Sequence, residues 1–486
     1  MKYFFLIVFL LYVFCCSAQS LGAMQIKALL DTAAFDKWSS SVEQPQISHD
    51  GKYASYLITN LPSGSKTLFL KSVDNSWNVQ IASVPLGEFS PDNKRFVFLT
   101  SNDSLGIVSL GQSSIEYIPH VVQFRLFLQD SIASIAYWSK MEKEIVIQSL
   151  INENKKTFDS VENFWPIKDK RILTLEYVSG AANADERAMC IVDLKNDTKQ
   201  TIWRGIKPKT VIVDNANDQI AFAAKTNLSG GGGNSIWYYK SGYQNAILLT
   251  DSESKAKNNA DEIDNIVDFS KDGNKIFFTL KKINVNEKSS AKPTALVLWS
   301  YTDLVLQSEQ LKQIKDPPYA YNLAVIVING KKVIRLIKDN EMLIESFPNP
   351  SRQDNYILIR HTSGRGASSE FNWNRYSTTS MYLESTSNGK RILLDGITNG
   401  HLSLTQKFVV YYNYKQHNFF SYEVSSGIKR NITKGIQTSW IRKDFEHDIL
   451  NERNDRGIAG WTTHDSAVLI YDQYDIWKVY LARCRK

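Results

Sequence analysis

The stretch FSPDNKRFVFLT, Phe89 to Thr100, places a polar turn directly before a run of aromatic and β-branched residues. ISHDGKYASYLI, which begins at Ile47, and FSKDGNKIFFTL, which begins at Phe269, repeat this order of residue types. An Asp after the serine can order a turn through its own side chain, and the Gly or Asn that follows can adopt a positive φ. The repeat therefore predicts a turn that starts a strand, and we interpret it as scaffold rather than as a catalytic motif.

Units of this kind recur along the whole chain. Neighbouring units lie roughly 40 to 60 residues apart, close to the ~40 to 50 residues of one four-stranded propeller blade. Clear units begin near Ser48, Ser90, Lys168, Asn215, Ser270 and Thr463, and weaker ones near Asp130, Gln353 and Thr405. This count of about seven to nine predicts an all-β protein, a β-propeller of seven or eight four-stranded blades.

Strand-like runs fill the space between these turns. Beyond Gln46 they arrive about every ten residues and are bounded by Asn, Asp, Gly or Ser. Examples are YASYLIT (53–59), RFVFLT (95–100), ALVLWSY (295–301) and FVVYYNY (408–414). Their β-branched and aromatic residues are typical of strands. Alternate residues, such as Phe96 and Phe98, are expected to pack between neighbouring blades.

The N-terminus has a different pattern. Residues 1–18, MKYFFLIVFLLYVFCCSA, combine Lys2 with an apolar run and small residues, which indicates a signal peptide. A membrane anchor or a lipoprotein is a weaker interpretation, because the run is short and Cys15 and Cys16 follow bulky residues. We expect an exported protein, periplasmic or extracellular, with no membrane association after cleavage. Residues 19–46 then form an N-terminal helical segment with one short amphipathic helix, and residues 47–486 form the propeller.

Composition excludes several classes of protein. The chain has 486 residues, 43% of them hydrophobic, which is enough for a large packed core. Its net charge of +7 comes from 57 basic and 50 acidic residues that are interspersed, so nucleic-acid binding has little support. Only Cys190 and Cys484 remain after the signal peptide, which excludes a disulfide framework.

The common catalytic motifs are missing. No serine has glycine at both the second position before and the second after it; Ser368 has Gly366 before it but Glu370 after it. The seven histidines are scattered, and the glycine-rich SGGGGNS lacks the rest of a phosphate loop. The acidic group Asp261, Glu262 and Asp264 lacks calcium-loop spacing, so we expect a solvated loop. We therefore assign no catalytic, cofactor-binding or metal-binding residue and no cofactor.

Two terminal stretches carry a family resemblance. FDKWSSSVEQPQISHDGKYASYLI (35–58) and HDSAVLIYDQYDIWKVYL (464–481) make this chain similar to the prolyl oligopeptidase family of serine peptidases, in particular its large exported bacterial members. The resemblance implies a propeller that covers an α/β-hydrolase domain and admits short peptides to a Ser-Asp-His triad. This chain has no such domain, so no catalytic position can be carried over. It also has no Glu-Glu dipeptide, the feature with which dipeptidyl peptidase IV-like members hold the substrate's amino terminus.

Three functional hypotheses follow. The first is the non-catalytic, substrate-gating and peptide-binding propeller of an exported peptidase, whose partners are peptide substrates and a hydrolase domain missing from this chain. A truncated reading frame, suggested by LARCRK at residues 481–486, is one interpretation of that absence, and a genuine short tail is the other. The second is a stand-alone TolB-like propeller that binds a protein partner or a glycan. The third is a propeller glycosidase with paired acids around its channel.

Overall fold

The structure is a computed structural model, and it describes residues 40–61, 64–129, 132–152, 154–167, 171–178, 184–225, 233–251, 261–282, 307, 322–338, 341–345, 353–362, 379–394, 397, 400–442 and 455–481. The predicted signal peptide, the predicted N-terminal helix, the run 295–301 and the unit near Lys168 lie outside these residues. So do Ser368, Cys484 and most of the glycine-rich segment. No helix within the described ranges is long and apolar enough to cross a membrane.

The described residues form nine antiparallel sheets, numbered here 1 to 9 in chain order. Eight have four strands and sheet 9 has three, and neighbouring strands in each sheet are consecutive in the chain. Two compact units contain them, Met1–Thr157 and Phe158–Lys486, with the boundary inside the last strand of sheet 3. A series of such sheets, each built from one continuous segment, is the architecture of β-propeller blades.

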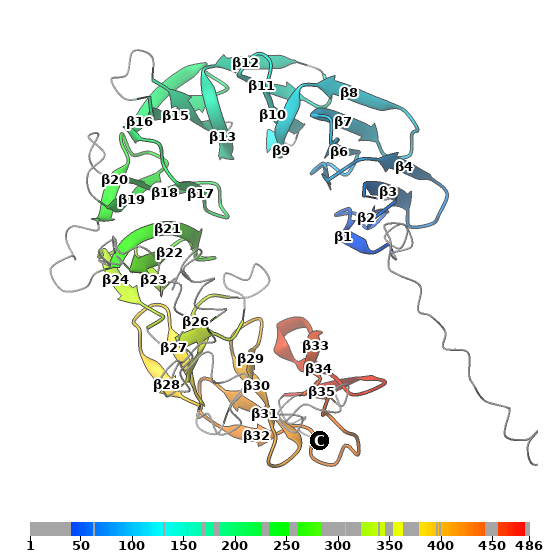
Figure 1. Cartoon of the computed structure of the whole chain (residues 1–486), viewed down its shortest axis with the longest axis vertical. Helices are drawn as coiled ribbons and strands as arrows, with labels where there is room; N and C mark the ends of the chain where they lie inside the picture. The colour runs from blue at the N-terminus through cyan, green and yellow to red at the C-terminus, as the bar shows by residue number, and fades with distance from the viewer. Residues whose placement is uncertain are drawn as a thin grey trace, which may run out of the picture. The chain divides into compact units, whose positions relative to one another are not determined.

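The first unit holds sheets 1 to 3 (Figure 1). Sheet 1 consists of β1 (Val42–Ile47), β2 (Tyr53–Thr59), β3 (Lys66–Ser72) and β4 (Asn78–Ala82); sheet 2 of β5 (Leu86–Phe89), β6 (Arg95–Leu99), β7 (Ser104–Ser109) and β8 (Ile115–Pro119); sheet 3 of β9 (Val121–Gln129), β10 (Ile132–Ser139), β11 (Glu144–Ser149) and β12 (Lys155–Asp159).

The second unit holds sheets 4 to 9. Sheet 4 consists of β13 (Val161–Ile167), β14 (Arg171–Tyr177), β15 (Glu186–Asp193) and β16 (Thr198–Ile206); sheet 5 of β17 (Thr210–Val213), β18 (Gln219–Lys225), β19 (Asn234–Lys240) and β20 (Ile247–Asp251); sheet 6 of β21 (Asp261–Phe269), β22 (Lys275–Lys282), β23 (Asn322–Val327) and β24 (Lys332–Arg335). Sheet 7 consists of β25 (Glu341–Leu343), β26 (Tyr356–Thr362), β27 (Thr379–Ser385) and β28 (Arg391–Leu393); sheet 8 of β29 (Gly400–Leu402), β30 (Phe408–Asn413), β31 (Asn418–Glu423) and β32 (Lys429–Asn431); sheet 9 of β33 (Ile458–Trp461), β34 (Ala467–Tyr471) and β35 (Ile476–Tyr480), with the 3-10 helix η3 (Thr463–Asp465) between its first two strands.

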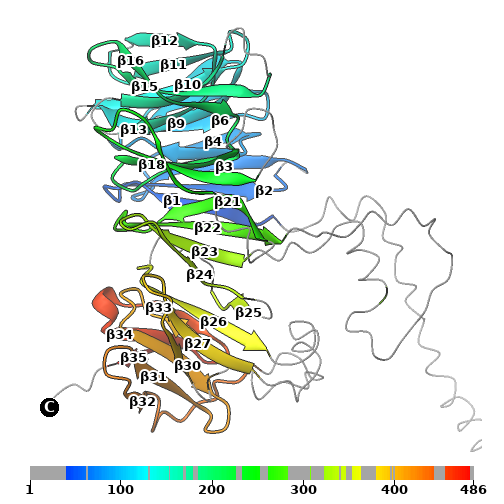
Figure 2. The same ribbon diagram turned by 90° about the vertical axis from the view of Figure 1, so that its left-hand side faces the viewer.

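Within each unit the sheets pack face to face. In β22, Phe278 joins a core shared with sheet 5, whereas its neighbour Phe277 joins a core shared with sheet 7. Successive side chains of a strand point to opposite faces, so one strand supplies two cores. Figure 2 shows sheets 7 and 8 as neighbouring layers, and they share a third core around Leu383 and Val409. Burying one such aromatic or aliphatic side chain contributes roughly 1.5 to 3 kcal/mol.

The predicted fold is confirmed. The chain is all-β, and Phe96 and Phe98 pack between sheets 1 and 2 as expected. All nine units marked in the sequence, the three weaker ones included, fall between the first and second strands of the nine sheets. The number of sheets is therefore one above the upper predicted blade count, because the weaker units also mark sheets. The first strand begins at Val42, ahead of the residue 47 at which the predicted propeller begins.

Candidate functional site

The repeated turn is ordered by its own side chains. In the copy at Phe269, the Ser270 hydroxyl donates to Asp272 Oδ1 (2.6 Å) and accepts the backbone N–H of Lys275 (2.9 Å). Gly273 has a φ of 67°, a value that suits glycine. The copies that begin at Ser48 and Ser90 have the same hydrogen bonds. The turn chemistry predicted from the sequence is thus confirmed.

The turns also bind one another across neighbouring sheets, which the sequence did not indicate. In each case the donor is a backbone N–H one or two residues after the first serine of a turn. The acceptor is a side chain in the corresponding turn of the next sheet. The three pairs are His49 to Asn93 Oδ1 (2.8 Å), Lys271 to Asp354 Oδ2 (2.6 Å) and Thr405 to Asp465 Oδ2 (3.0 Å). Adjacent sheets are therefore joined by directed hydrogen bonds as well as by their apolar cores.

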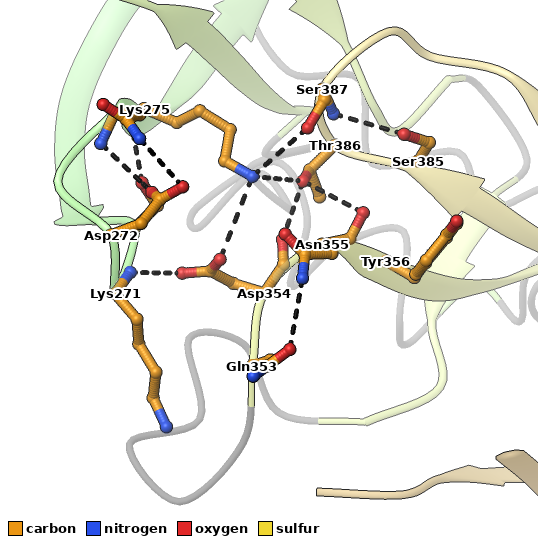
Figure 3. A network of polar contacts seen from close by, with 12 residues as sticks. Lys271, Asp272, Lys275, Gln353, Asp354, Asn355, Tyr356, Ser385, Thr386 and Ser387 are labelled. Carbon is orange, nitrogen blue, oxygen red and sulfur yellow. Dashed lines mark hydrogen bonds and ion pairs between the residues drawn. The ribbon is translucent and has the colours of Figure 1, made fainter. Parts of the chain in front are cut away.

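A polar network joins sheets 6 and 7 (Figure 3). Lys275 begins β22 and is only 3% exposed. Its Nζ lies 3.1 Å from Thr386 Oγ1, 3.4 Å from Ser387 Oγ and 3.9 Å from Asp354 Oδ1. Thr386 Oγ1 in turn donates to the backbone carbonyl of Asp354 (2.7 Å). One buried ammonium thus connects two loops of sheet 7 to the repeated turn of sheet 6.

The pKa values of the two acids in this network, Asp354 and Asp272, are shifted in opposite directions. Burial raises the pKa of Asp354, although the Lys271 N–H and the Lys275 ammonium oppose the shift. Burial would also raise the pKa of Asp272, but the hydrogen bonds from Ser270 and Asn274 outweigh it and hold that pKa below its ordinary value. Because these groups satisfy one another, the network serves as a joint between sheets rather than as an open binding site.

A second polar cluster lies within sheet 7, on β25, β27 and β28. The Arg391 guanidinium donates to both oxygens of Glu341 (2.6 and 2.9 Å) and to Glu384 (2.7 Å). Burial raises the pKa of Glu384, which is 1% exposed, to about 7, with Arg391 opposing the shift. The hydrogen bonds that Arg391 donates to Glu341 raise the pKa of Arg391. Removing one partner of such a buried ion-paired group destabilises the fold, because it leaves a buried charge without its counter-charge.

Charged residues recur on or beside the first strands of the second unit. In Figure 1, β13, β17, β29 and β33 lie on the same side of their sheets, opposite to the last strands. Glu162 on β13 pairs with Arg187 and with Lys207, which precedes β17. Lys209, also before β17, lies 2.9 Å from Asp264 on β21. The side chains of Lys207 and Lys209 are 49% and 53% exposed, so both remain partly accessible to solvent despite their ion pairs. We call Glu162, Lys207, Lys209 and Asp264 the charge row.

A further group of titratable residues links sheets 7, 8 and 9. His401 Nδ1, on β29, lies 3.5 Å from Glu345 Oε1, which follows β25. Burial raises the pKa of Asp455, just before β33, and the charge of His401 opposes this shift. Within the described part of the chain, no Ser, Thr or Cys side chain is hydrogen-bonded to a histidine. This group therefore lacks the nucleophile that a triad requires.

The expectation that Asp261, Glu262 and Asp264 form a solvated loop is wrong, because all three lie on strand β21 and are partly buried. Asp261 pairs with Arg335 (2.8 Å) and Asp264 with Lys209, so each carboxylate has its own cation. No cluster of His, Cys, Asp and Glu among the described residues has a metal-binding arrangement. Sequence reasoning nominated none of the network residues. The one signal was Lys275 itself, a charged residue at the position that starts a buried strand.

The known proteins that are similar to this chain are found among solved structures. No family model matches the chain, and no curated protein matches it. Its structural neighbours include β-propeller domains of prolyl oligopeptidase-family peptidases. The β-propeller domain of the trilobed protease from Pyrococcus furiosus is 12% identical, with a TM-score of 0.36, over 73% of this chain and 97% of that one. Pyrococcus horikoshii acylaminoacyl peptidase is 10% identical, with a TM-score of 0.36, over 78% of this chain and 58% of that one.

The fold is also found outside peptidases. The β-propeller domain of Myceliophteria thermophila Cps50 (Swd1) is 6% identical, with a TM-score of 0.33, over 73% of this chain and 97% of that one. These likenesses concern the fold alone. The chain spans little more than half of the acylaminoacyl peptidase.

Proposed function

We propose that this chain is a non-catalytic, peptide-binding β-propeller that gates substrates for an exported serine peptidase similar to the prolyl oligopeptidase family. The observation that carries the proposal is the charge row. It places two half-exposed lysines between Glu162 of sheet 4 and Asp264 of sheet 6, on or beside the first strands of sheets 4 to 6. In a propeller the blades surround a central channel, so such a row would face molecules that enter it.

The chemistry of the row suits short peptides. An extended peptide has backbone N–H groups and an amino terminus, which donate to carboxylates. It also has backbone C=O groups and a carboxyl terminus, which accept from ammonium groups. The half-exposed Lys207 and Lys209 attract carboxylates, while Glu162 and Asp264 keep the row from becoming a site for polyanions alone. The row thus favours peptides with an acidic side chain or a free carboxyl terminus.

Peptide binding is tested by fluorescence anisotropy with labelled hexapeptides and the purified chain. We expect Lys209→Met to weaken binding of acidic peptides roughly two- to fivefold, as for a partly exposed ion pair. Lys199→Met is the matched control, because Lys199 is 52% exposed and also ion-paired, with Glu176, but lies on the last strand of sheet 4. Absence of peptide binding, or an equal effect of both variants, would overturn the proposal.

Two further measurements test the remaining parts. Hydrolysis of short chromogenic peptides should be absent, and turnover that a serine-directed inhibitor abolishes would contradict a non-catalytic role. Sequencing the gene beyond the codon for Lys486 distinguishes a peptidase with a downstream G-x-S-x-G segment from a stand-alone propeller. For the export proposal, the protein recovered outside the cytoplasm should begin at Gln19; a chain retained inside with Met1 intact would contradict it.

A further inference from the structure

One face of sheet 1 carries a groove with a volume of about 310 Å³. Leu57, Leu68 and Leu70 pack from the opposite face into the core shared with sheet 2. The groove lies on the other face of strands β2, β3 and β4, where the alternate residues are only partly buried. Its lining includes Tyr56, Phe69, Lys71, Trp77, Asn78 and Gln80. The volume is at the lower end of the range for small-molecule sites.

Aromatic rings form the base of this groove. Tyr56 and Phe69 are paired residues of β2 and β3, and their rings are parallel, with centroids 5.3 Å apart. The ring of Trp77 is held edge-on against Tyr53, with centroids 5.8 Å apart. The Trp77 indole N–H is shielded from solvent and donates to none of the described residues. The groove therefore presents the outer faces and edges of two stacked rings, beside an indole N–H that donates to none of the described residues.

Polar side chains surround the rings. Gln80 of β4 is opposite Phe69, and Asn78 is opposite Lys71. Among the described residues, the side chains of Lys71, Asn75, Asn78 and Gln80 have no hydrogen-bond partner. A side-chain amide offers both donors and an acceptor, so three of these four groups can bind hydroxyls of either orientation. Aromatic surface with a few convergent polar groups is the usual composition of a ligand site.

We propose that this groove binds a neutral oligosaccharide, independently of any peptide bound at the charge row. A sugar ring has one apolar face of C–H groups, which fits the rings of Tyr56 and Phe69, and hydroxyls that both donate and accept. A phosphorylated ligand would need more than the single cation Lys71. An organic cation would be attracted by the rings but repelled by the same ammonium group. A purely apolar ligand would leave the amides desolvated and unpaired.

Isothermal titration calorimetry tests the proposal with the purified chain. The probes are hexasaccharides of glucose, mannose, galactose, xylose and N-acetylglucosamine at millimolar concentration. At least one should bind. Phe69→Ala should weaken that binding about tenfold, the effect of losing one aromatic contact. Asn78→Ala, at an exposed position that does not threaten folding, should weaken it severalfold. Trp77→Phe keeps an aromatic ring but removes the indole N–H together with part of the ring surface.

Tyr474→Ala is the matched control. Tyr474 is an 83% exposed aromatic residue that does not line the groove, so this variant should bind as the parent does. Circular dichroism confirms that each variant is folded. The proposal is overturned if no hexasaccharide binds, or if the groove variants bind sugars as tightly as the Tyr474 variant does. It is also overturned if Phe69→Ala abolishes the binding of short peptides rather than of sugars.

Discussion

The ammonium of Lys275 in sheet 6 lies 3.9 Å from the carboxylate of Asp354 in sheet 7, and the lysine is only 3% exposed. A charge this deeply buried is tolerated only with close polar partners. Thr386 and Ser387 supply them, on a loop of the same neighbouring sheet. The turn that starts each second strand has thus acquired, in sheet 6, an additional role as an anchor for the next sheet.

Removing this lysine should destabilise the protein strongly. Lys275→Met leaves Asp354 buried beside an apolar chain, and we expect a loss of about 3 to 5 kcal/mol in the free energy of unfolding, measured by urea denaturation. The double variant Lys275→Met/Asp354→Asn should recover part of this loss because the unpaired charge is gone. Lys271→Met is the control, since its exposed side chain makes no described contact and should matter by less than about 0.5 kcal/mol. Equal losses in the two lysine variants would contradict the account.

Two glycines of the repeated turn should respond differently to alanine. Gly51 (φ 71°) and Gly273 (φ 67°) both occupy the left-handed region, which costs alanine roughly 1 to 2 kcal/mol. A Cβ at Gly51 would meet nothing within 4 Å, whereas one at Gly273 would lie 2.4 Å from Gln219 Nε2. Gln219 is held by Asp214 and Tyr238, so it cannot move without breaking hydrogen bonds. Urea midpoints should therefore fall further for Gly273→Ala; similar shifts in both variants would exclude this close approach.

Stability should fall as the pH rises from weakly acidic to weakly basic. Burial raises the pKa of Glu384 from its ordinary 4.5 to about 7, so the folded chain keeps a proton that the unfolded chain has released. The resulting stabilisation is fully present below 4.5 and is lost as the pH rises through about 7, by roughly 1 to 3 kcal/mol. Glu384→Gln should flatten this part of the profile, whereas Glu142→Gln, at an exposed turn, should not. An unchanged profile in Glu384→Gln would show that another group titrates.

The Cys190 thiol should be inert in the folded protein. Cys190 is 1% exposed, and burial raises its pKa, so little of the reactive thiolate forms. In a mature chain that begins at Gln19 and carries Cys484→Ser, Cys190 is the only thiol. We expect an aromatic disulfide reagent to label it only in denaturant, in step with the unfolding of sheet 4. Labelling of the native chain within minutes would be inconsistent with this burial.

The sequence revealed the central strands of the sheets far better than the edge strands. β10 and β22 are second strands, buried on both faces, and read as nearly continuous apolar runs. By contrast, β12 (KKTFD) is exposed along most of its length and β1 (VEQPQI) alternates weakly, so neither stood out. Edge strands have one unpaired side, and they commonly carry polar residues. Turn chemistry was a more reliable guide to the number of sheets than the strands themselves.

The polar networks could not have been found in the same way. Lys275 and Thr386 are 111 residues apart in the chain and meet only because sheet 7 packs on sheet 6. The aromatic groove has a similar origin, since Tyr56, Phe69 and Gln80 come together through the register of three strands. Periodicity shows that such residues are in strands, but it does not show which of them become neighbours.

The hydrogen bonds between turns also give the sheets a fixed order. In each of the three pairs the earlier sheet supplies the N–H and the later sheet supplies the side-chain acceptor, as with His49 and Asn93. Exchanging two blades by gene rearrangement would bring donors next to turns that lack the matching acceptor. The sheets look alike in outline, yet they are not interchangeable building blocks, and any engineered permutation of them would have to carry these acceptors along.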